Sequence, residues 1–357
     1  MNRILAFAML LMLVLLGFGT VGCGALVTFD AKSDKYNAAP KSSAALKSDE
    51  FMLDAARRFG LMALFSEVVY RRDLKDAEKD GQGCRYLEGK QKSDYELNFG
   101  MPKNSEDDGG WKRWIPEENS LIGPPCLDQA GLYYETYVHI DKFGAIDEAV
   151  IAFRGTENRW GQYFDDWSAN LVAALGFEPR QHALVRSHIP PLVDRLLAQS
   201  IAESRPIKIY ATGHSLGGGL AQEAGYLRPE ILEAFTFNTS PVTNWSYLRR
   251  HKAVANDYPI FHRIYNGGEF LEVPRFISTT FTAARFGRHD IGLQLTERKS
   301  FSGHGMSIIA CNFADLIASH PAIEGAHNYS VDYITRAVLW SGNEKEKLSV
   351  CSKPENS

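Results

Sequence analysis

Residues 207–221 read IKIYATGHSLGGGLA and contain the most informative pattern in the chain. The apolar residues of 207–212 predict a short buried strand, and the pattern of 217–227 predicts a helix. Ser215 lies between the two, flanked by glycines in a G-x-S-x-G pattern. Glycines allow a strand to turn sharply into a helix without crowding. This context therefore predicts a nucleophile elbow, with the serine hydroxyl exposed at the carboxyl end of the strand.

Strands and helices alternate along the chain around this turn. The predicted strands are 131–140, 149–156, 207–212, 234–237 and 261–265. The predicted helices are 49–72, 165–176, 182–204, 217–227 and 327–340. Alternation of this kind from residue 149 onward favours a mainly parallel sheet with helices on both faces, so the expected fold class is α/β.

Composition and charge narrow the range of partners. The 357 residues are 45% hydrophobic and 23% charged, as in an ordinary globular protein that can bury a sizeable core. The formal net charge is −4 and there is no long basic run, which argues against a nucleic-acid partner. Neither the cysteines nor the histidines have the spacing of a metal site, so we expect no metal and no cofactor.

The N-terminal segment is typical of an export signal. Arg3 precedes an unbroken apolar run at 4–16, and small residues then lead to Cys23. This three-part pattern predicts a signal peptide at 1–22. The run is shorter than the ~20 residues of a spanning helix, although an uncleaved anchor stays open as an alternative. The V-G-C sequence ending at Cys23 resembles a bacterial lipoprotein signal. We therefore expect a lipid on Cys23 that holds the protein at a membrane surface, with 23–48 as a flexible tether.

The rest of the chain is expected to form one domain at 49–342, followed by a polar tail at 343–357. Charged residues, Gly, Asn and Pro dominate 73–125, which reads as an insertion that contains two tryptophans. The expected location is the bacterial envelope, with lipid anchoring at the outer membrane or the periplasmic face. Plain secretion is the alternative.

Four cysteines follow the signal segment, and an even number permits disulfides outside the cytoplasm. They are Cys84, Cys126, Cys311 and Cys351. Three pairings exist and the sequence selects none of them, while buried free thiols remain the alternative.

Several motifs accompany the elbow in a fixed order. They are VIAFRGTE (150–157), DDWSANL (165–171), TGHSLGGGLA (212–221), FTFNTSP (235–241), RIYNGGE (263–269) and HNYSVDYI (327–334). Together they resemble the class 3 lipases, the fungal-type triacylglycerol lipase family of the α/β-hydrolase fold, over about residues 130–340. The resemblance implies an α/β-hydrolase fold, with a mainly parallel central sheet flanked by helices, and a Ser–acid–His triad.

In this reading Ser215 is the nucleophile, Glu269 the acid and His327 the base. A serine hydroxyl attacks only when a base takes its proton, and a carboxylate must orient the imidazole. Glu269 stands three residues after Asn266, where the family usually has Asp. Glu272 stays open as the acid, because Val-Pro follows it as in the family.

Other residues keep a place in the assignment. Asp257 and Asp290 are further alternatives for the acid. The histidines that follow either glutamate are His289, His304, His320 and His327. Of these His304 is the second choice for the base, whereas His214, inside the elbow, is expected to be structural.

The oxyanion hole needs two N–H donors. The resemblance assigns them to Leu216, directly after the nucleophile, and to Thr156 in the R-G-T motif. Arg154 is expected to be a structural ion-pair residue. A lid or acyl groove in 157–181 is an open alternative for three aromatic residues, which are Trp160, Tyr163 and Phe164.

The expected function is hydrolysis of carboxylic esters of lipids through an acyl-enzyme, of triacylglycerol lipase or phospholipase type. The expected partners are a lipid ester substrate and a membrane surface. A short-chain esterase, thioesterase or amidase on the same fold is one alternative, and a non-catalytic envelope protein is another. The natural lipid and the oligomeric state do not follow from the sequence.

Overall fold

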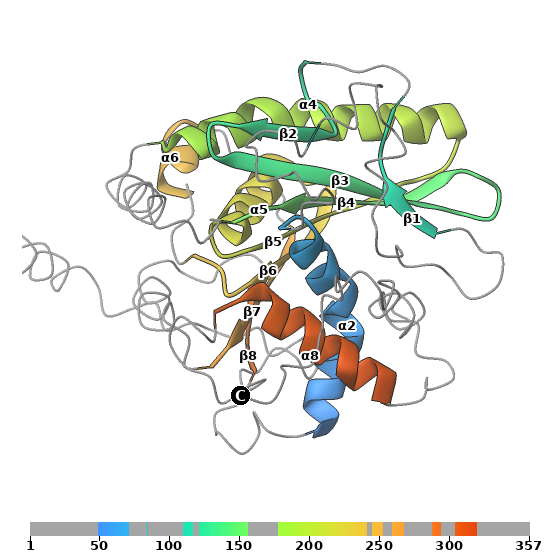
Figure 1. Ribbon diagram of the computed structural model, residues 1–357. Coiled ribbons are helices and arrows are strands. Elements are labelled where there is room, and N and C mark those ends of the chain that lie inside the picture. Colours follow the sequence, from blue (N-terminus) through green and yellow to red (C-terminus); the bar gives the residue numbers. More distant parts are fainter. Residues whose placement is uncertain are drawn as a thin grey trace, which may run out of the picture.

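An eight-stranded mixed sheet forms the centre of the computed structural model (Figure 1). The structure describes residues 49–70, 84, 110–116, 121–155, 178–240, 245–252, 259–267, 288–293 and 304–319. The strands are β1 (Gly110–Arg113), β2 (Cys126–Gln129), β3 (Leu132–Ile140), β4 (Ile146–Phe153), β5 (Lys208–His214), β6 (Ile231–Phe237), β7 (Ile260–Asn266) and β8 (Arg288–Leu293). The helices are α2 (Asp49–Val68), α4 (Arg180–Glu203), α5 (Leu216–Leu227), α6 (Trp245–Arg250) and α8 (Met306–Ser319).

Strand order follows chain order from β3 to β8. β3 and β4 form an antiparallel hairpin, and β4 through β8 pair in parallel. β1 and β2 share the outer edge of β3, β2 along its first half and β1 along its second half. The antiparallel strands thus lie at one side of a mainly parallel sheet.

The same order explains how the helices are distributed. Right-handed crossovers that advance in one direction place their helices on the same face of a sheet. Accordingly α4 and α5, which connect β4 to β5 and β5 to β6, pack together on one face (Figure 1). The opposite face is covered by α2 and α8, which pack against each other although they lie far apart in the sequence. Helices therefore flank both faces, as the sequence predicts.

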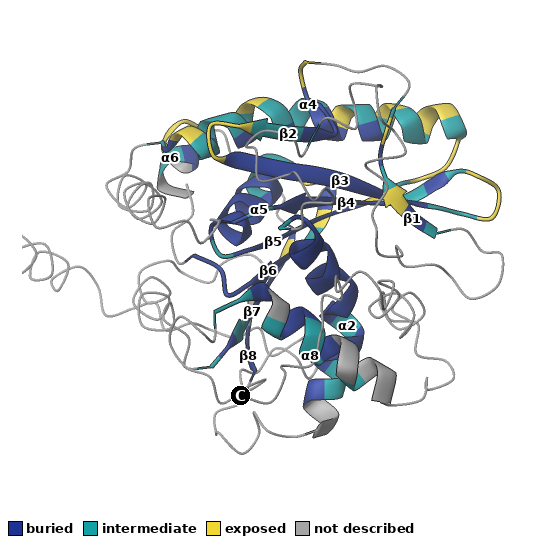
Figure 2. Ribbon diagram, in the orientation of Figure 1, coloured by how far each residue is buried: buried dark blue, intermediate teal, exposed yellow. Residues whose placement is uncertain are grey.

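Side chains along β4 show how the two cores are built. Val150 and Ala152 join the core under α2 and α8, whereas Ala149, Ile151 and Phe153 join the core under α4 and α5. All five are completely buried, and the central strands are dark blue in Figure 2. A strand covered on both faces is apolar throughout rather than alternating. Burial of one such large side chain contributes about 1.5–3 kcal/mol.

The predicted insertion at 73–125 contains a strand that the sequence pattern did not reveal. β1 lies in this interval and pairs with β3. Its Trp111 is 4% exposed and the nearby Trp114 is 5% exposed, so both indoles belong to the core. The aromatic residues in this polar segment therefore mark a sheet edge.

Five elements, which are β1, β2, β8, α6 and α8, were not predicted, while the strands predicted at 131–140, 149–156, 207–212, 234–237 and 261–265 correspond to β3 to β7. The helices predicted at 165–176 and 327–340 lie outside the described residues, as do 1–48 and 343–357. The mixed sheet with flanking helices fits an α/β-hydrolase-like fold. Of the described helices, none is long and apolar enough to cross a membrane.

Disulfides form, as the cysteine count permits. Cys84 bonds to Cys126, the first residue of β2, and ties position 84 to the sheet edge. Cys311 in α8 is also disulfide-bonded, to a partner outside the described residues. The first bond selects one pair from the alternatives that the sequence left open.

Candidate active site

Ser215 lies between the end of β5 and the start of α5, in a backbone conformation that residues other than glycine rarely adopt. Its φ is 55° and its ψ is −124°. Such a conformation persists only where the surroundings impose it, at a strain of about 1–3 kcal/mol. Here the Ser215 N–H donates to the Phe237 carbonyl at 3.0 Å, and the Ser215 carbonyl accepts from the Ser240 N–H at 3.0 Å. Residues at and just beyond the end of β6 therefore hold the serine in its turn.

The two glycines of the motif are required by the closeness of the backbone around them. A Cβ atom on Gly213 would lie 2.3 Å from the carbonyl oxygen of Gly217. A Cβ atom on Gly217 would lie 2.4 Å from the carbonyl oxygen of Phe153, at the end of β4. Backbone atoms cannot move aside as a flexible side chain can. Strand, turn and helix thus follow one another here as the motif predicts.

Leu216 is the first residue of α5, directly after Ser215. The first N–H groups of a helix have no partner within the helix, and the helix dipole makes this end positive. An N–H in this position can donate to a negative oxygen that develops beside the serine. Leu216 is thus placed as an oxyanion donor would be.

The end of β4 approaches the elbow from the other side. The ideal Cβ position of Gly155 lies 3.2 Å from the Ser215 Cβ and 2.4 Å from the His214 carbonyl oxygen. Gly155 is the last described residue of this segment, and the predicted donor Thr156 follows it. Gly155 of the R-G-T motif therefore lies beside Ser215.

His214 uses both ring nitrogens within the protein. Its Nε2 lies 2.7 Å from the carbonyl oxygen of His304, and its Nδ1 lies 2.8 Å from the hydroxyl of Tyr70. A carbonyl only accepts, so Nε2 carries the proton and Nδ1 accepts from the Tyr70 O–H. The ring is therefore held on both sides by hydrogen bonds within the protein, as a structural role requires.

His304, the second choice for the base, lies close to the elbow just before α8. Its ring centroid is 4.7 Å from that of His214. Its carbonyl oxygen accepts from His214 Nε2 and, at 2.9 Å, from the Asn238 side-chain amide. These contacts place the His304 backbone beside the residue that precedes Ser215.

Most of the other predicted site residues lie outside the described part of the chain. They are Cys23, Thr156, Trp160, Tyr163, Phe164, Asp257, Glu269, Glu272, His320 and His327. His289 and Asp290 lie within β8, paired along the backbone with His262 and Arg263 of β7. Asp290 is therefore in mid-strand, whereas Asn266, three residues before Glu269, is the last residue of β7.

Arg154 belongs to a group of polar side chains at the edge of the sheet. Its guanidinium lies over the Tyr133 ring, 4.1 Å from the centroid. Tyr133 in turn donates to Glu135, a carboxylate that is 1% exposed. Glu135 also accepts from the Tyr137 hydroxyl at 2.6 Å and from Arg113 Nε at 2.8 Å. Burial, together with the charge of Glu135, raises the pKa of Tyr137. Tyr137 therefore stays protonated and donates a hydrogen bond to Glu135. These contacts agree with a structural role for Arg154.

Three residues at the elbow escaped the sequence reading, namely Tyr70, Gly155 and Asn238. Their roles depend on contacts between distant segments, and a single sequence gives no spacing signal for such contacts. Within the described ranges, no group of three or more His, Cys, Asp or Glu side chains could hold a metal ion.

One protein-family model matches the central part of the chain. A family model described as phospholipase-like, the Tle-like phospholipase domain, matches residues 62–258, which is more than half of the chain. No curated protein matches this chain.

Two solved structures are similar to parts of the chain. An S-formylglutathione hydrolase from Staphylococcus aureus is 10% identical, with a TM-score of 0.30, over 61% of this chain and 98% of that chain. A carboxyl esterase from the mycorrhizal fungus Tuber melanosporum is 9% identical, with a TM-score of 0.31, over 60% of this chain and 84% of that chain.

Proposed function

We propose that the chain, which belongs to the Tle-like phospholipase domain family, cleaves carboxylic esters of lipids through an acyl-enzyme on Ser215. Family membership gives the reaction class, which is lipid ester hydrolysis. The observation that carries the assignment of the nucleophile is the strained backbone of Ser215 at the first turn of α5. Strain of this kind gathers at functional sites, where it aims a side chain.

The proposed reaction has two steps. Ser215 Oγ attacks the ester carbonyl carbon while His327 takes its proton, and the N–H groups of Leu216 and Thr156 donate to the resulting oxyanion. The alcohol leaves with the proton from His327, and the acyl group remains on Ser215. Water then attacks the acyl-enzyme with the help of His327, which releases the fatty acid. Glu269 holds the imidazole in its reactive orientation.

The position of β7 supports Glu269 over the alternative Asp290. Ser215 follows the last residue of β5, and β7 is parallel to β5, with only β6 between them. Glu269 follows the last residue of β7 by three positions. Asp290 lies inside β8, three residues before the end of that strand, and so does not lie beyond the carboxyl edge of the sheet. Glu272 and Asp257 keep their place as alternatives.

The substrate class within lipid esters is a finer proposal. The family model favours a phospholipid, and the motifs that resemble class 3 lipases favour an acylglycerol. We place the phospholipid first, because the family model spans the elbow and its flanking elements together. A short-chain esterase, thioesterase or amidase is the alternative within serine hydrolases, and a non-catalytic envelope protein is the alternative outside them.

An exported, lipid-anchored form completes the proposal. The signal segment 1–22 and Cys23 would give a lipoprotein that stays at a membrane surface. The Cys84–Cys126 disulfide supports export, because disulfides persist in oxidising compartments. Mass spectrometry of the mature N-terminus tests this form, and a chain that keeps residues 1–22 without lipid would contradict it.

The decisive experiment compares wild type with Ser215→Ala. A fluorophosphonate that reacts with activated serines is expected to label the wild type at Ser215 and to leave the variant unlabelled. Fatty-acid release from phosphatidylcholine vesicles and from a triacylglycerol emulsion, measured in parallel, then ranks the substrates. A wild-type protein that is folded and unlabelled would overturn the serine-hydrolase proposal.

A further inference from the structure

We propose that Tyr70, His214 and Asn238 form a polar network behind the proposed nucleophile. This network positions the three segments that lead to the proposed oxyanion donor, nucleophile and acid. We refer to these three side chains, with the His304 carbonyl, as the elbow network. None of its groups is proposed to touch the substrate, so they are positioning residues. The inference rests on the proposed function, because it assigns a role within the same site.

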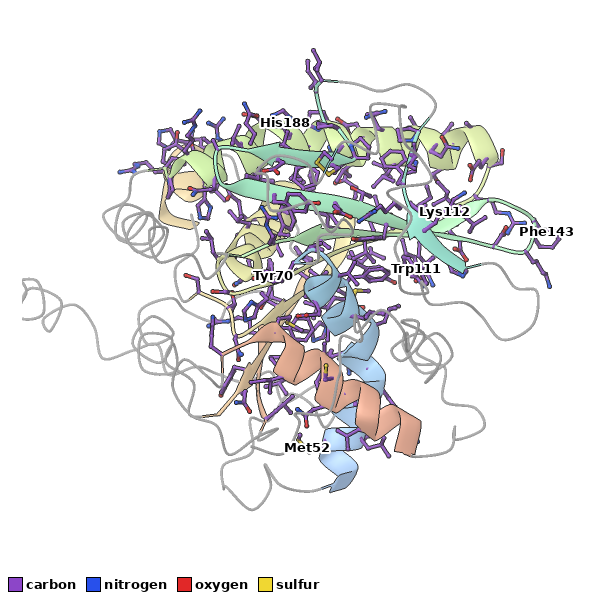
Figure 3. The ribbon with its side chains drawn as sticks, in the orientation of Figure 1. Met52, Tyr70, Trp111, Lys112, Phe143 and His188 are labelled. Atoms are coloured by element: carbon purple, nitrogen blue, oxygen red, sulfur yellow. A yellow bond between two sulfur atoms is a disulfide. The ribbon has the colours of Figure 1, made fainter. Side chains whose placement is uncertain are left out.

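The first part of the network joins the end of α2 to the R-G-T motif at 154–156, which we call the oxyanion segment. Tyr70 lies two residues after the end of α2, beside the central strands in Figure 3. Its hydroxyl accepts from the Gly155 N–H at 2.9 Å and donates to His214 Nδ1 at 2.8 Å. Gly155 directly precedes Thr156, and His214 directly precedes Ser215. One hydroxyl therefore holds the residues next to a proposed oxyanion donor and the proposed nucleophile.

The packing at this junction leaves little freedom. The ideal Cβ position of Gly155 is 2.4 Å from both the Tyr70 hydroxyl oxygen and the His214 carbonyl oxygen. The rings of Tyr70 and His214 also meet edge to face, with centroids 5.6 Å apart. Any side chain at 155 would push the oxyanion segment away from the elbow.

The second part joins the elbow to the region before α8. His214 Nε2 donates to the His304 carbonyl oxygen at 2.7 Å, and Asn238 Nδ2 donates to the same oxygen at 2.9 Å. Both lone pairs of this oxygen are thus used. Asn238 is completely buried, and its φ is 41°, so its backbone is also held in an unusual conformation.

The third part extends the network toward the proposed acid. The Asn238 side-chain oxygen accepts from the Asn266 N–H at 2.8 Å, and the Asn238 N–H donates to the Ile264 carbonyl at 2.8 Å. Asn266 ends β7, three residues before Glu269. The amide of Asn238 therefore ties the end of β7 to the same carbonyl that fixes His214.

The chain of contacts thus runs from the oxyanion segment to the acid segment through the residue before the nucleophile. A catalytic geometry that shifts by about 1 Å can lose about 100-fold in rate. A network outside the reacting atoms can therefore change kcat without changing how the substrate binds.

Tyr70→Phe is the direct test, because it removes the hydroxyl and keeps the ring that packs on His214. We expect kcat on a soluble p-nitrophenyl ester to fall about 10- to 100-fold, with KM within about threefold of wild type. The rate of inactivation by the fluorophosphonate should fall in parallel, because that reaction needs the same nucleophile and oxyanion donors.

Tyr134→Phe is the matched control. Tyr134 is completely buried, and its hydroxyl donates to the Pro124 carbonyl at 2.8 Å, away from the elbow. This variant loses one buried tyrosine hydrogen bond and should keep wild-type kcat and inactivation rate. If Tyr70→Phe loses as much thermal stability as Tyr134→Phe and also keeps wild-type kcat, the network is merely structural and the proposal is wrong.

A second pair of variants covers a failure of Tyr70→Phe to fold. His214→Asn retains an acceptor near Nδ1 for Tyr70, and His214→Gln retains a donor near Nε2 for His304. Each breaks one side of the network, so each should lower kcat more than it changes KM. Wild-type kcat in either would overturn the proposal. A wild-type protein without fluorophosphonate labelling would instead overturn the serine-hydrolase proposal, so the two failures are distinguishable.

Discussion

The carbonyl oxygen of Phe153 lies 2.4 Å from the point at which a side chain on Gly217 would begin. The end of β4 and the first turn of α5 therefore pack backbone against backbone. This contact sets how closely the R-G-T segment approaches Ser215, because the segment continues directly from β4.

Gly217→Ala should therefore harm both stability and activity. Overpacking of this kind destabilises by about 1–3 kcal/mol, and we expect ester hydrolysis to fall at least about 10-fold. Gly144→Ala is the control, since Gly144 in the β3–β4 turn has open space around it but a φ of +86°. It should lose about 1–2 kcal/mol and retain full activity. Urea unfolding and ester hydrolysis of both variants decide the matter, and equal activity in the two would contradict the argument.

The strained backbone at Ser215 should lower the unfolding free energy of the protein, while the Ser215 hydroxyl is required for kcat. Ser215→Ala removes the nucleophile and should lower kcat by about 10⁴-fold or more. Ser215→Gly should be equally inactive, yet its backbone adopts a positive φ without strain. The greater freedom of glycine in the unfolded chain offsets part of this gain, so we expect Ser215→Gly to exceed Ser215→Ala by about 1 kcal/mol in unfolding free energy. Denaturant melts of the two variants measure the difference, and an Ala variant as stable as the Gly variant would argue against strain at this position.

Glu148 should weaken the fold as the pH rises. Burial raises its pKa, and the nearby Lys208 ammonium, 3.8 Å away and largely exposed, lowers it by less. A carboxyl with a raised pKa binds its proton more tightly in the folded state. Stability from this residue is therefore fully present below the ordinary carboxyl range and decreases as the pH rises through the raised value.

Glu148→Gln should thus match wild type at acidic pH and become relatively more stable as the pH rises toward 7. Thermal melts of both proteins across pH 4–7 test this. A difference that shrinks with rising pH would give the opposite sign and refute the argument.

The Cys84–Cys126 bond should contribute measurably to stability. It closes a loop with a sequence separation of 42, which restricts the unfolded chain. Loops of this length give about 2–5 kcal/mol when native geometry is unstrained. The double variant Cys84→Ser/Cys126→Ser should lose this amount in urea unfolding while the Cys311 bond remains. Unchanged stability of the double variant would show that the loop is already restricted in the unfolded state.

The elements that the sequence predicted are those whose own residues carry the signal. β5 and α5 were predicted because an apolar run and a helical pattern adjoin the motif around Ser215. β8 and α8 were missed: β8 is a short strand, and its sequence RHDIGL begins with three polar residues rather than an apolar run. β1 was hidden because only Trp111 in its four residues is buried.

The site divides in a similar way. Ser215 and Leu216 follow from local spacing, since a sharp turn between a strand and a helix requires glycines at fixed positions. Tyr70 and Asn238 do not, because their contacts join segments that are separate in the sequence. Pairing of Cys84 with Cys126 is likewise a property of the fold, since spacing alone left three connectivities.

Tyr70 and His304 contact opposite sides of the His214 imidazole, so this arrangement can form only after both residues have been synthesised. Tyr70 leaves the ribosome long before His304 does, and α8 comes later still. A nascent chain that ends before His304 has no carbonyl to accept from His214, and no α8 to cover α2. On the proposed positioning role, the nucleophile gains its alignment only when most of the chain has been made. A partial translation product would then be less reactive toward the lipids of the cell that makes it.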